Sequence, residues 1–398
     1  MSDHNPVPEA EKFDPAKAGG LPKLLLIAGV AGLVGSLIVA LVSTKQFAYS
    51  YLFAFAYFFI ICVGCLFWTC VHHATDSEWS VVVRRQLENV AGLIPFLFLF
   101  FIPVILCFST LYKWWDLAPG VDPLLDKKQP YLTHWFFYLR VALYFVLLSW
   151  VATSLRRLST AQDEDGAARR SLTMRKFGVG GIPVVALGIT FAGFDWLMGL
   201  DFHWSSTMWG VYLFAGAAGS SMSLLVLIVT ALKSKGFLKV VNDEHYHMMG
   251  KWMLAFSVFW AYIGFDQYML IWYANIPEET IYFITRNTGN WWYLSFGLVL
   301  FRFFLPFPIL LTQWIKKTPQ YLKYMAMWIL FMELIDVFVI VLPFLRKGGF
   351  GFLDVICSLL PVVGIGGILG WLFFRNLTSS YLFPTKDPRL AASLKLSN

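Results

Sequence analysis

The sequence predicts an all-α polytopic membrane protein that crosses the bilayer about ten times. Hydrophobic residues make up 58% of the chain and charged residues only 14%, with a mean hydropathy of +0.64, whereas soluble domains carry roughly 25% charged residues. The apolar residues form continuous runs of about 20, the length that a helix needs to cross hydrocarbon. Because these runs do not alternate with polar residues, they predict helices and not the strands of a barrel.

Each apolar run is expected to be one transmembrane helix, and polar segments precede the first run and follow the last. The expected helices are, in order, 22–42, 51–69, 90–111, 135–155, 181–200, 207–232, 252–273, 291–314, 321–345 and 352–374. The expected domains are an N-terminal cytoplasmic tail at 1–21, a transmembrane domain at 22–376 and a C-terminal cytoplasmic tail at 377–398.

The distribution of Lys and Arg predicts the orientation. The two ends and the even-numbered loops hold about twenty of these residues, against about seven in the odd-numbered loops, and positively charged loops stay in the cytoplasm. We therefore expect both termini to be cytoplasmic. The richest stretch, 156–176, is expected to be a solvated connector. Topology and contact with anionic lipids account for the net charge of +7, and we expect no nucleic-acid partner.

The five cysteines lie inside apolar runs, and we expect them to be small apolar fillers. Cys62 and Cys65 have the spacing of a metal-binding pair, but no second pair accompanies them. The chain also has no Cys-x-x-Cys-His sequence for haem attachment. We therefore expect no metal ligated by this chain and no covalently bound cofactor.

Charged residues interrupt some of the apolar runs, and they are the first candidate functional residues. A charge at the centre of a bilayer costs about 2.5–3.5 kcal/mol on insertion scales, so these side chains should face one another or water. Glu333 and Asp336 are three residues apart and hence on one helical face, where two carboxylates in low dielectric tend to share a proton. The charged residues are Arg140, Asp195, Asp266, Arg302, Glu333 and Asp336.

Histidines and a proline add to these candidates. His72 and His73 close the second expected helix on the cytoplasmic side, and His203 lies in the outer connection between the fifth and sixth helices. Histidine relays protons near neutral pH, although a histidine at the interface is also commonly a solvated cap. Pro306 would leave the carbonyl of Arg302 without its helical N–H donor, which predicts a bend beside a charge.

Two sites follow from these residues as hypotheses. The first is a proton pathway, which is expected to pass through His72 or His73, then Glu333, Asp336 and Arg302, and then Asp266 and Asp195. The second is a quinone or menaquinone site near the outer face, which needs a proton acceptor and an apolar slot. Its candidate residues are Arg140, Asp195, His203 and Asp266. Aromatic packing that simply fills this region is the alternative.

Three long segments resemble the membrane subunits of bacterial alternative complex III, especially the smaller subunit, ActF or quinone-binding subunit 2. Segment 245–283 reads HYHMMGKWMLAFSVFWAYIGFDQYMLIWYANIPEETIYF. Segment 193–212 reads GFDWLMGLDFHWSSTMWGVY, and segment 72–85 reads HHATDSEWSVVVRR. The pattern of ten apolar runs is similar to that family over nearly the whole chain.

This resemblance implies the fold of the NrfD or polysulfide-reductase membrane subunits, with two four-helix bundles, about 49–200 and 205–345, and two flanking helices. It also implies a subunit of a quinol:electron-acceptor oxidoreductase in a bacterial cytoplasmic (inner) membrane. The implied partners are a larger homologous membrane subunit, a periplasmic iron–sulfur subunit and c-type cytochrome subunits, which would carry the iron–sulfur clusters and haem c. This chain would scaffold the larger subunit and provide a proton pathway.

Two other functions are consistent with the residues. The chain could be a stand-alone secondary transporter whose buried charges bind a solute or coupling ion, and broken helices at matching positions in its two halves would favour that function. It could also be a purely structural anchor whose charges are locked in salt bridges.

Overall fold

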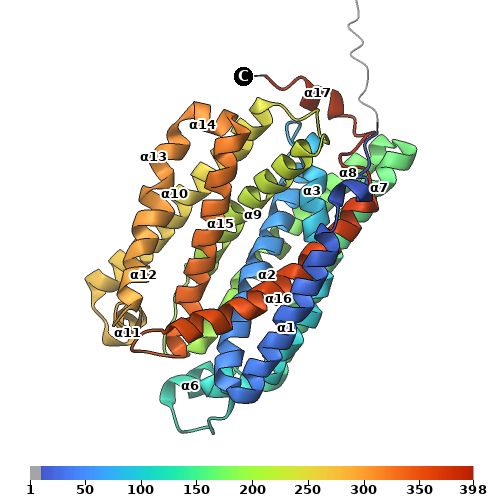
Figure 1. The fold of residues 1–398 in the computed structure, drawn as a ribbon. Helices are drawn as coiled ribbons and strands as arrows, with labels where there is room; N and C mark the ends of the chain where they lie inside the picture. The colour runs from blue at the N-terminus through green and yellow to red at the C-terminus, as the bar shows by residue number, and fades with distance from the viewer. Residues whose placement is uncertain (1–9, 398) are drawn as a thin grey trace, which may run out of the picture.

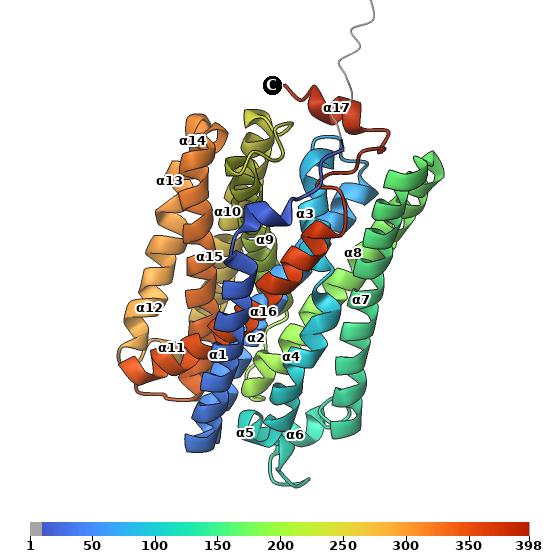
Figure 2. The same ribbon diagram turned by 45° about the vertical axis from the view of Figure 1, so that its right-hand side comes forward.

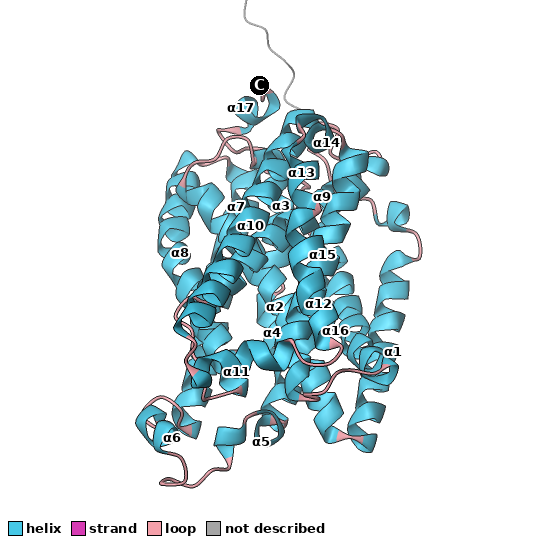
Figure 3. Ribbon diagram, turned by 90° about the vertical axis from the view of Figure 1, so that its left-hand side faces the viewer, coloured by secondary structure: helices cyan, strands magenta, loops and turns pink. Residues whose placement is uncertain are grey.

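A computed structural model describes residues 10–397, so Asn398 and the first nine residues of the expected N-terminal tail lie outside the described residues. Over 10–397 the regular structure is helical (Figure 3), apart from one isolated antiparallel bridge between Lys12 and Tyr381. Ten helices of this part of the chain are long and apolar enough to cross a membrane. This confirms the expected all-α polytopic architecture (Figure 1).

The ten spans fall where the apolar runs predict them. They are α1 (Leu21–Val42), α2 (Thr44–Ala74), α3 with α4 (Val81–Ala91 and Ile94–Leu106), α7 (His134–Asp165), α8 (Ala168–Trp196), α9 (Trp209–Ser234), α10 (Asp243–Ala274), α12 with α13 (Trp291–Leu298 and Pro306–Leu311), α15 (Pro319–Val341) and α16 (Phe352–Thr378). Short elements connect or extend them: η1 (Pro15–Ala18), α5 (Phe108–Leu111), η2 (Lys113–Trp115), α6 (Pro123–Lys128), η3 (Met198–Leu200), α11 (Pro277–Arg286), η4 (Val299–Phe304), α14 (Gln313–Lys317), η5 (Leu342–Phe344) and α17 (Leu390–Leu394).

The spans pack as two four-helix bundles with two flanking helices, as the resemblance implies. The first bundle contains α2, α3 with α4, α7 and α8, and the second contains α9, α10, α12 with α13, and α15. Helices α2 and α9 pack against each other and join the bundles. Helices α1 and α16 pack together, and α16 also packs on α2. In Figure 2, α7 lies at one edge of the molecule and α12 and α13 lie at the opposite edge.

Helices α1 and α16 approach each other closely because glycines lie at their crossing. A Cβ atom on Gly32 would lie 2.7 Å from the carbonyl oxygen of Leu360, and one on Gly364 would lie 2.9 Å from the backbone nitrogen of Leu33. Both positions therefore require glycine. Small residues at such a crossing let two helices pack in a membrane, where no hydrophobic effect drives their association.

Both described ends of the chain lie at one end of the molecule, which we call the tail end. Besides the bridge between Lys12 and Tyr381, the N–H of Leu382 donates a hydrogen bond to the carbonyl of Glu11 at 2.8 Å. The opposite end, which we call the far end, carries α6 and α11 (Figure 1). An even number of spans returns the chain to the side on which it began, in agreement with this arrangement.

Several helices extend beyond their apolar runs at the tail end. The stretch 156–176, expected to be a solvated connector, is almost entirely helical, because α7 continues to Asp165 and α8 begins at Ala168. Gly166, with a φ of 64°, ends α7 as a left-handed cap. Helix α3 similarly begins at Val81, before the expected start at 90, and its side chains are buried. A hydropathy scan detects only the apolar part of a helix, so the expected spans do not include these polar turns.

Pro306 interrupts the eighth span, as its position predicts. The preceding turn, η4, is a π-helix, and the N–H of Leu305 donates to the carbonyl of Leu300, five residues earlier, at 2.9 Å. Proline has no N–H to bond the carbonyl of Arg302, and a wider π turn accommodates the break. Arg302 lies in this turn and is buried.

Candidate functional site

The centre of the second bundle contains a buried group of charged and aromatic side chains, which we call the central cluster: Tyr212, Trp260, Arg302, Glu333 and Asp336. Nη1 of Arg302 donates a hydrogen bond to Oδ2 of Asp336 at 2.5 Å, and Nη2 donates to Glu333. Arg302, Glu333 and Asp336 are 5%, 2% and 4% exposed. The expectation that these three side chains face one another is confirmed.

The aromatic members of the central cluster bind to its charged members. The hydroxyl of Tyr212 donates to Asp336 at 2.6 Å, and Nε1 of Trp260 donates to Asp336 at 3.2 Å. The guanidinium of Arg302 lies 4.0 Å from the centre of the Trp260 ring, in a cation–π contact. Asp336 therefore accepts hydrogen bonds from three side chains, whereas Glu333 accepts one from Arg302 only.

The first bundle contains a separate buried ion pair between Arg140 on α7 and Asp195 on α8. Nε and Nη2 of Arg140 each donate to one carboxylate oxygen of Asp195 at 2.8 Å, and the hydroxyl of Tyr144 donates to the same carboxylate at 2.6 Å. The guanidinium also lies 3.8 Å from the centre of the Tyr131 ring. This bidentate pair balances one positive charge with one negative charge.

A second group of charged side chains lies at the tail end of the first bundle, and we call it the tail-end cluster: His72, His73, Arg84, Arg85 and Glu88. Nε2 of His73 and Nε of Arg84 lie 3.4 and 3.2 Å from Oε1 of Glu88, and Nε of Arg85 lies 3.1 Å from its Oε2. All five side chains are buried. Neither ring nitrogen of His72 has a hydrogen-bond partner among the described residues.

The C-terminal segment covers the tail-end cluster through Asp387. This carboxylate lies 2.8 Å from Nη2 of Arg84 and 2.9 Å from Nη2 of Arg389, and Arg389 also pairs with Asp76 at 2.9 Å. Burial alone would raise the pKa of Asp387, but the hydrogen bonds and positive charges of Arg389 and Arg84 outweigh it and hold this pKa well below its usual range. The ion pair therefore fixes the C-terminal segment to α3.

The structure does not bring the remaining expected residues to the central cluster. Asp195 is paired with Arg140 in the other bundle. Asp266 is partly exposed on α10 and makes no hydrogen bond or ion pair within 10–397. The outer part of the expected proton route therefore has no continuous set of contacts. Hydropathy gives the depth of a residue in a span, but it does not give the direction in which its side chain points.

The residues expected to form a quinone site are likewise dispersed. Arg140 and Asp195 pair as described, but His203 lies in a loop at the far end. There its Nε2 is 2.7 Å from Asp122 and its Nδ1 is 3.7 Å from Asp201. The pKa of Asp122 lies below its ordinary value, mainly because this carboxyl group accepts the hydrogen bond from His203. With Asp266 at the surface of α10, these four side chains do not share one pocket.

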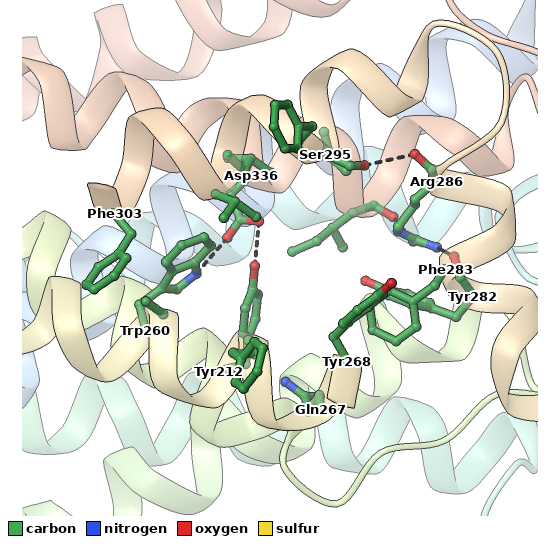
Figure 4. A pocket seen from close by; sticks show the side chains of 18 of the residues that line it. Tyr212, Trp260, Gln267, Tyr268, Tyr282, Phe283, Arg286, Ser295, Phe303 and Asp336 are labelled. Atoms are coloured by element: carbon green, nitrogen blue, oxygen red, sulfur yellow. Dashed lines mark hydrogen bonds between the residues drawn. The ribbon is translucent and has the colours of Figure 1, made fainter. Parts of the chain in front are cut away.

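A cavity of about 620 Å³ lies instead in the second bundle, and its lining includes Tyr212, Trp260 and Asp336 of the central cluster. Figure 4 shows these three side chains at one end of the cavity and Tyr282 and Arg286 at the other. Burial raises the pKa of Tyr282 to about 12, so its hydroxyl keeps its proton at neutral pH. A cavity of this size could hold a small molecule.

Sequence reasoning missed several residues of these sites. The third expected helix begins at 90 and so does not include Arg84, Arg85 and Glu88, although Arg84 and Arg85 end the segment that resembles the known family. Arg286 lies between the seventh and eighth expected helices, so a search for charges within the apolar runs does not find it. Tyr212 and Trp260 are uncharged residues within spans, and only the fold shows that they bind Asp336.

Comparison with protein-family models and with curated proteins found no match to this chain. Among the described residues, no three His, Cys, Asp or Glu side chains are grouped so as to hold a metal ion.

Proposed function

We propose that this chain is an integral membrane subunit of a respiratory or photosynthetic quinol:electron-acceptor oxidoreductase of the alternative complex III type, in a bacterial inner membrane. In this proposal it scaffolds the larger homologous subunit and provides a transmembrane proton pathway, with the tail end in the cytoplasm. The observation that carries the proposal is the central cluster, in which two carboxyl groups share one guanidinium inside the bundle. The resembling segments 72–85, 193–212 and 245–283 supply the type of complex.

The charge count of the central cluster suits proton exchange. Glu333 and Asp336 together carry two negative charges when ionised, and Arg302 supplies one positive charge. The cluster is therefore neutral only when one carboxyl group binds a proton, and gain or loss of that proton changes the charge of a buried site. The Arg140–Asp195 pair is already neutral, so we assign it a structural role.

A chain of contacts supports a route between the tail end and the central cluster. The rings of His72 and Trp68 lie 5.7 Å apart, and Nε1 of Trp68 donates to the carbonyl of Ala218 on α9 at 2.9 Å. Gly216, in the same turn of α9, lies against the carboxyl group of Glu333. The route therefore follows the interface of α2 and α9, where the two bundles meet.

Buried hydroxyl groups on α9 lie along this route. Ser220 and Ser221 are fully buried, and their hydroxyls donate to the carbonyls of Gly216 and Ala217 at 2.5 and 2.6 Å. Each hydroxyl oxygen can still accept a hydrogen bond from a water or a protonated group. In this proposal these serines relay protons between the tail-end cluster and Glu333.

The cavity provides the second half of the route. Asp336 lines it, and so do Tyr282 and Arg286 towards the far end (Figure 4). A proton that leaves the central cluster would pass through this space, in place of the expected steps at Asp266 and Asp195. The iron–sulfur clusters and haem c of the complex would belong to the periplasmic partner subunits, which would dock at the far end.

Purification of the native complex tests this proposal. An affinity-tagged chain, extracted in mild detergent from the cells that make it, should bring with it a c-type haem spectrum. It should also bring the masses of a larger homologous membrane subunit, an iron–sulfur subunit and cytochrome subunits. A chain that purifies alone from the same cells, free of haem-bearing proteins, would contradict the proposal and favour a stand-alone transporter.

One observation favours a purely structural anchor as the second candidate. Arg140, Asp195, Arg302, Glu333 and Asp336 all lie in salt bridges, which is the arrangement that a locked scaffold would have. The two candidates differ in proton movement. A structural anchor would keep the full proton-to-electron ratio of its complex when each of these charges, alone or in pairs, is neutralised.

A further inference from the structure

Two lysines lie where α10 packs on α14 at the tail end (Figure 1), and we call them the lysine pair: Lys251 and Lys316. Lys251 is exposed on α10, whereas Lys316 on α14 is only 6% exposed. The side chain of Lys316 lies across Gly250, the residue before Lys251, because a Cβ atom on Gly250 would lie 2.7 Å from Cγ of Lys316. Glycine at position 250 therefore leaves the room that this side chain occupies.

The lysine pair makes no salt bridge within the described part of the chain. Nζ of Lys316 donates one hydrogen bond, to the carbonyl of Leu311 at 3.3 Å. The carboxyl group of Glu244, on the first turn of α10, binds Lys317 and His247 instead. Because an ammonium group has three N–H donors, Lys316 keeps two donors and a positive charge for another partner.

The two positive charges of the lysine pair act on each other. The pKa of Lys316 lies below its ordinary value, first because burial removes its ammonium group from water and then because the positive charge of Lys251 is near. A buried cation costs free energy unless it is paired with an anion. An anion held between the two lysines would therefore stabilise both charges.

The surface around the lysine pair has the composition of the headgroup layer of a bilayer. Trp314, Tyr321 and Tyr324 are exposed there, and the rings of Trp314 and Tyr321 lie 4.8 Å apart. Aromatic side chains with a polar edge collect at the level of the lipid headgroups. Leu311, whose carbonyl binds Lys316, also exposes its side chain. Apolar surface that suits an acyl chain therefore borders the two charges.

We infer that the lysine pair binds the phosphate of an anionic phospholipid in the leaflet at the tail end, with an acyl chain along Leu311 and Trp314. Basic pockets between transmembrane helices bind headgroups of this kind. A soluble phosphate would also supply the anion, but it would leave the exposed apolar side chains uncovered, so the surroundings favour the lipid. The inference goes beyond the proposed function and does not depend on it.

Lys316 has a simpler role as the alternative, which is to cap the end of α13. A lysine near a helix C-terminus commonly binds the last carbonyl groups, and Leu311 is the last residue of α13. A cap needs Lys316 alone, whereas a shared phosphate needs Lys251 as well. The two roles therefore differ in the contribution of Lys251, which is exposed and can be replaced without loss of buried contacts.

Native mass spectrometry of the full-length protein, purified in detergent with the subunits that accompany it, tests the inference. Phosphatidylglycerol is the probe, and the wild type should bind it in preference to phosphatidylcholine with the same acyl chains. Lys251→Gln and Lys316→Gln should each weaken this binding by about fivefold, the effect of one lysine near an anionic lipid surface. The matched control is Lys239→Gln, which removes the same charge from an exposed position between α9 and α10 and should bind as the wild type does.

Four results would overturn the inference. The first is wild-type affinity for phosphatidylglycerol in Lys251→Gln, which would leave Lys316 as a cap of α13. The second is equal binding of the two lipids by the wild type. The third is a loss in Lys239→Gln as large as in the other two variants, which would indicate a general attraction to the basic tail end. The fourth is displacement of the lipid by an equal concentration of inorganic phosphate, which would identify a soluble ligand.

Discussion

Gly216 on α9 faces the carboxyl group of Glu333 on α15 so closely that a Cβ atom at position 216 would lie 2.7 Å from Oε1. Glu333 is thus held between the backbone of one helix and the guanidinium of Arg302. Because α9 also packs on α2, this contact is where the charged centre of the second bundle meets the interface with the first.

Gly216→Ala should therefore displace Glu333 and destabilise the protein. Overpacking in a buried site costs about 1–3 kcal/mol, which thermal unfolding in detergent would detect. The matched control is Gly219→Ala on the same helix, where a Cβ atom would meet Phe256 at an ordinary 3.4 Å. Equal unfolding temperatures for the two variants would show that Glu333 does not depend on this contact.

Arg302→Met should destabilise the protein more than removal of all three charges. It leaves Glu333 and Asp336 buried without their cation, and a broken buried ion pair costs about 3–5 kcal/mol. The triple variant Arg302→Met/Glu333→Gln/Asp336→Asn has no unpaired charge and should recover much of this loss. Thermal unfolding of both variants checks the prediction, which fails if the triple variant is as unstable as the single one.

The attachment of the C-terminal segment should depend on pH through Asp387. Positive charges hold its folded pKa below the unfolded value of about 3.9. A depressed folded pKa stabilises the fold fully above the unfolded pKa, and this stabilisation is lost as pH falls through the folded pKa. Wild-type protein should resist cleavage of 379–397 down to about pH 4, and Asp387→Asn should be cleaved faster there.

Limited digestion with pepsin, which is active in acid, measures this difference. The two proteins should converge as the pH falls further, because protonation of Asp387 then removes the same charge as the substitution. Glu164→Gln, an exposed carboxyl group near the same segment, serves as the control and should match the wild type. Equal cleavage of wild type and Asp387→Asn at about pH 4 to 5 would refute the role of this ion pair.

The ten spans were predictable from the sequence because hydrophobic length is a property of each run alone. The helix ends were not. Helix α10 begins at Asp243, before the expected start at 252, because Asn242 and His245 form a capping box and polar turns follow it. Polar turns of this kind lower the local hydropathy, so the helix and the apolar run differ in length.

The candidate site was only partly predictable, and the reason is the direction of side chains. The spacing of Glu333 and Asp336 places both on one face of a helix, and the structure confirms their meeting with Arg302. Asp266 also places a negative charge within an apolar run, but its side chain is partly exposed on α10. Rotation of each helix depends on packing between helices, and neither hydropathy nor charge determines that packing.

The proton-to-electron ratio of quinol oxidation in sealed vesicles tests the proton pathway most directly. In Glu333→Gln the ion pair between Arg302 and Asp336 remains and no buried charge is left unpaired, so the complex should assemble with its haem spectrum intact and move fewer protons per electron. Asp266→Asn, which changes a carboxyl group of the same bundle outside the central cluster, should keep the wild-type ratio. A full ratio in the assembled Glu333→Gln complex would contradict the account.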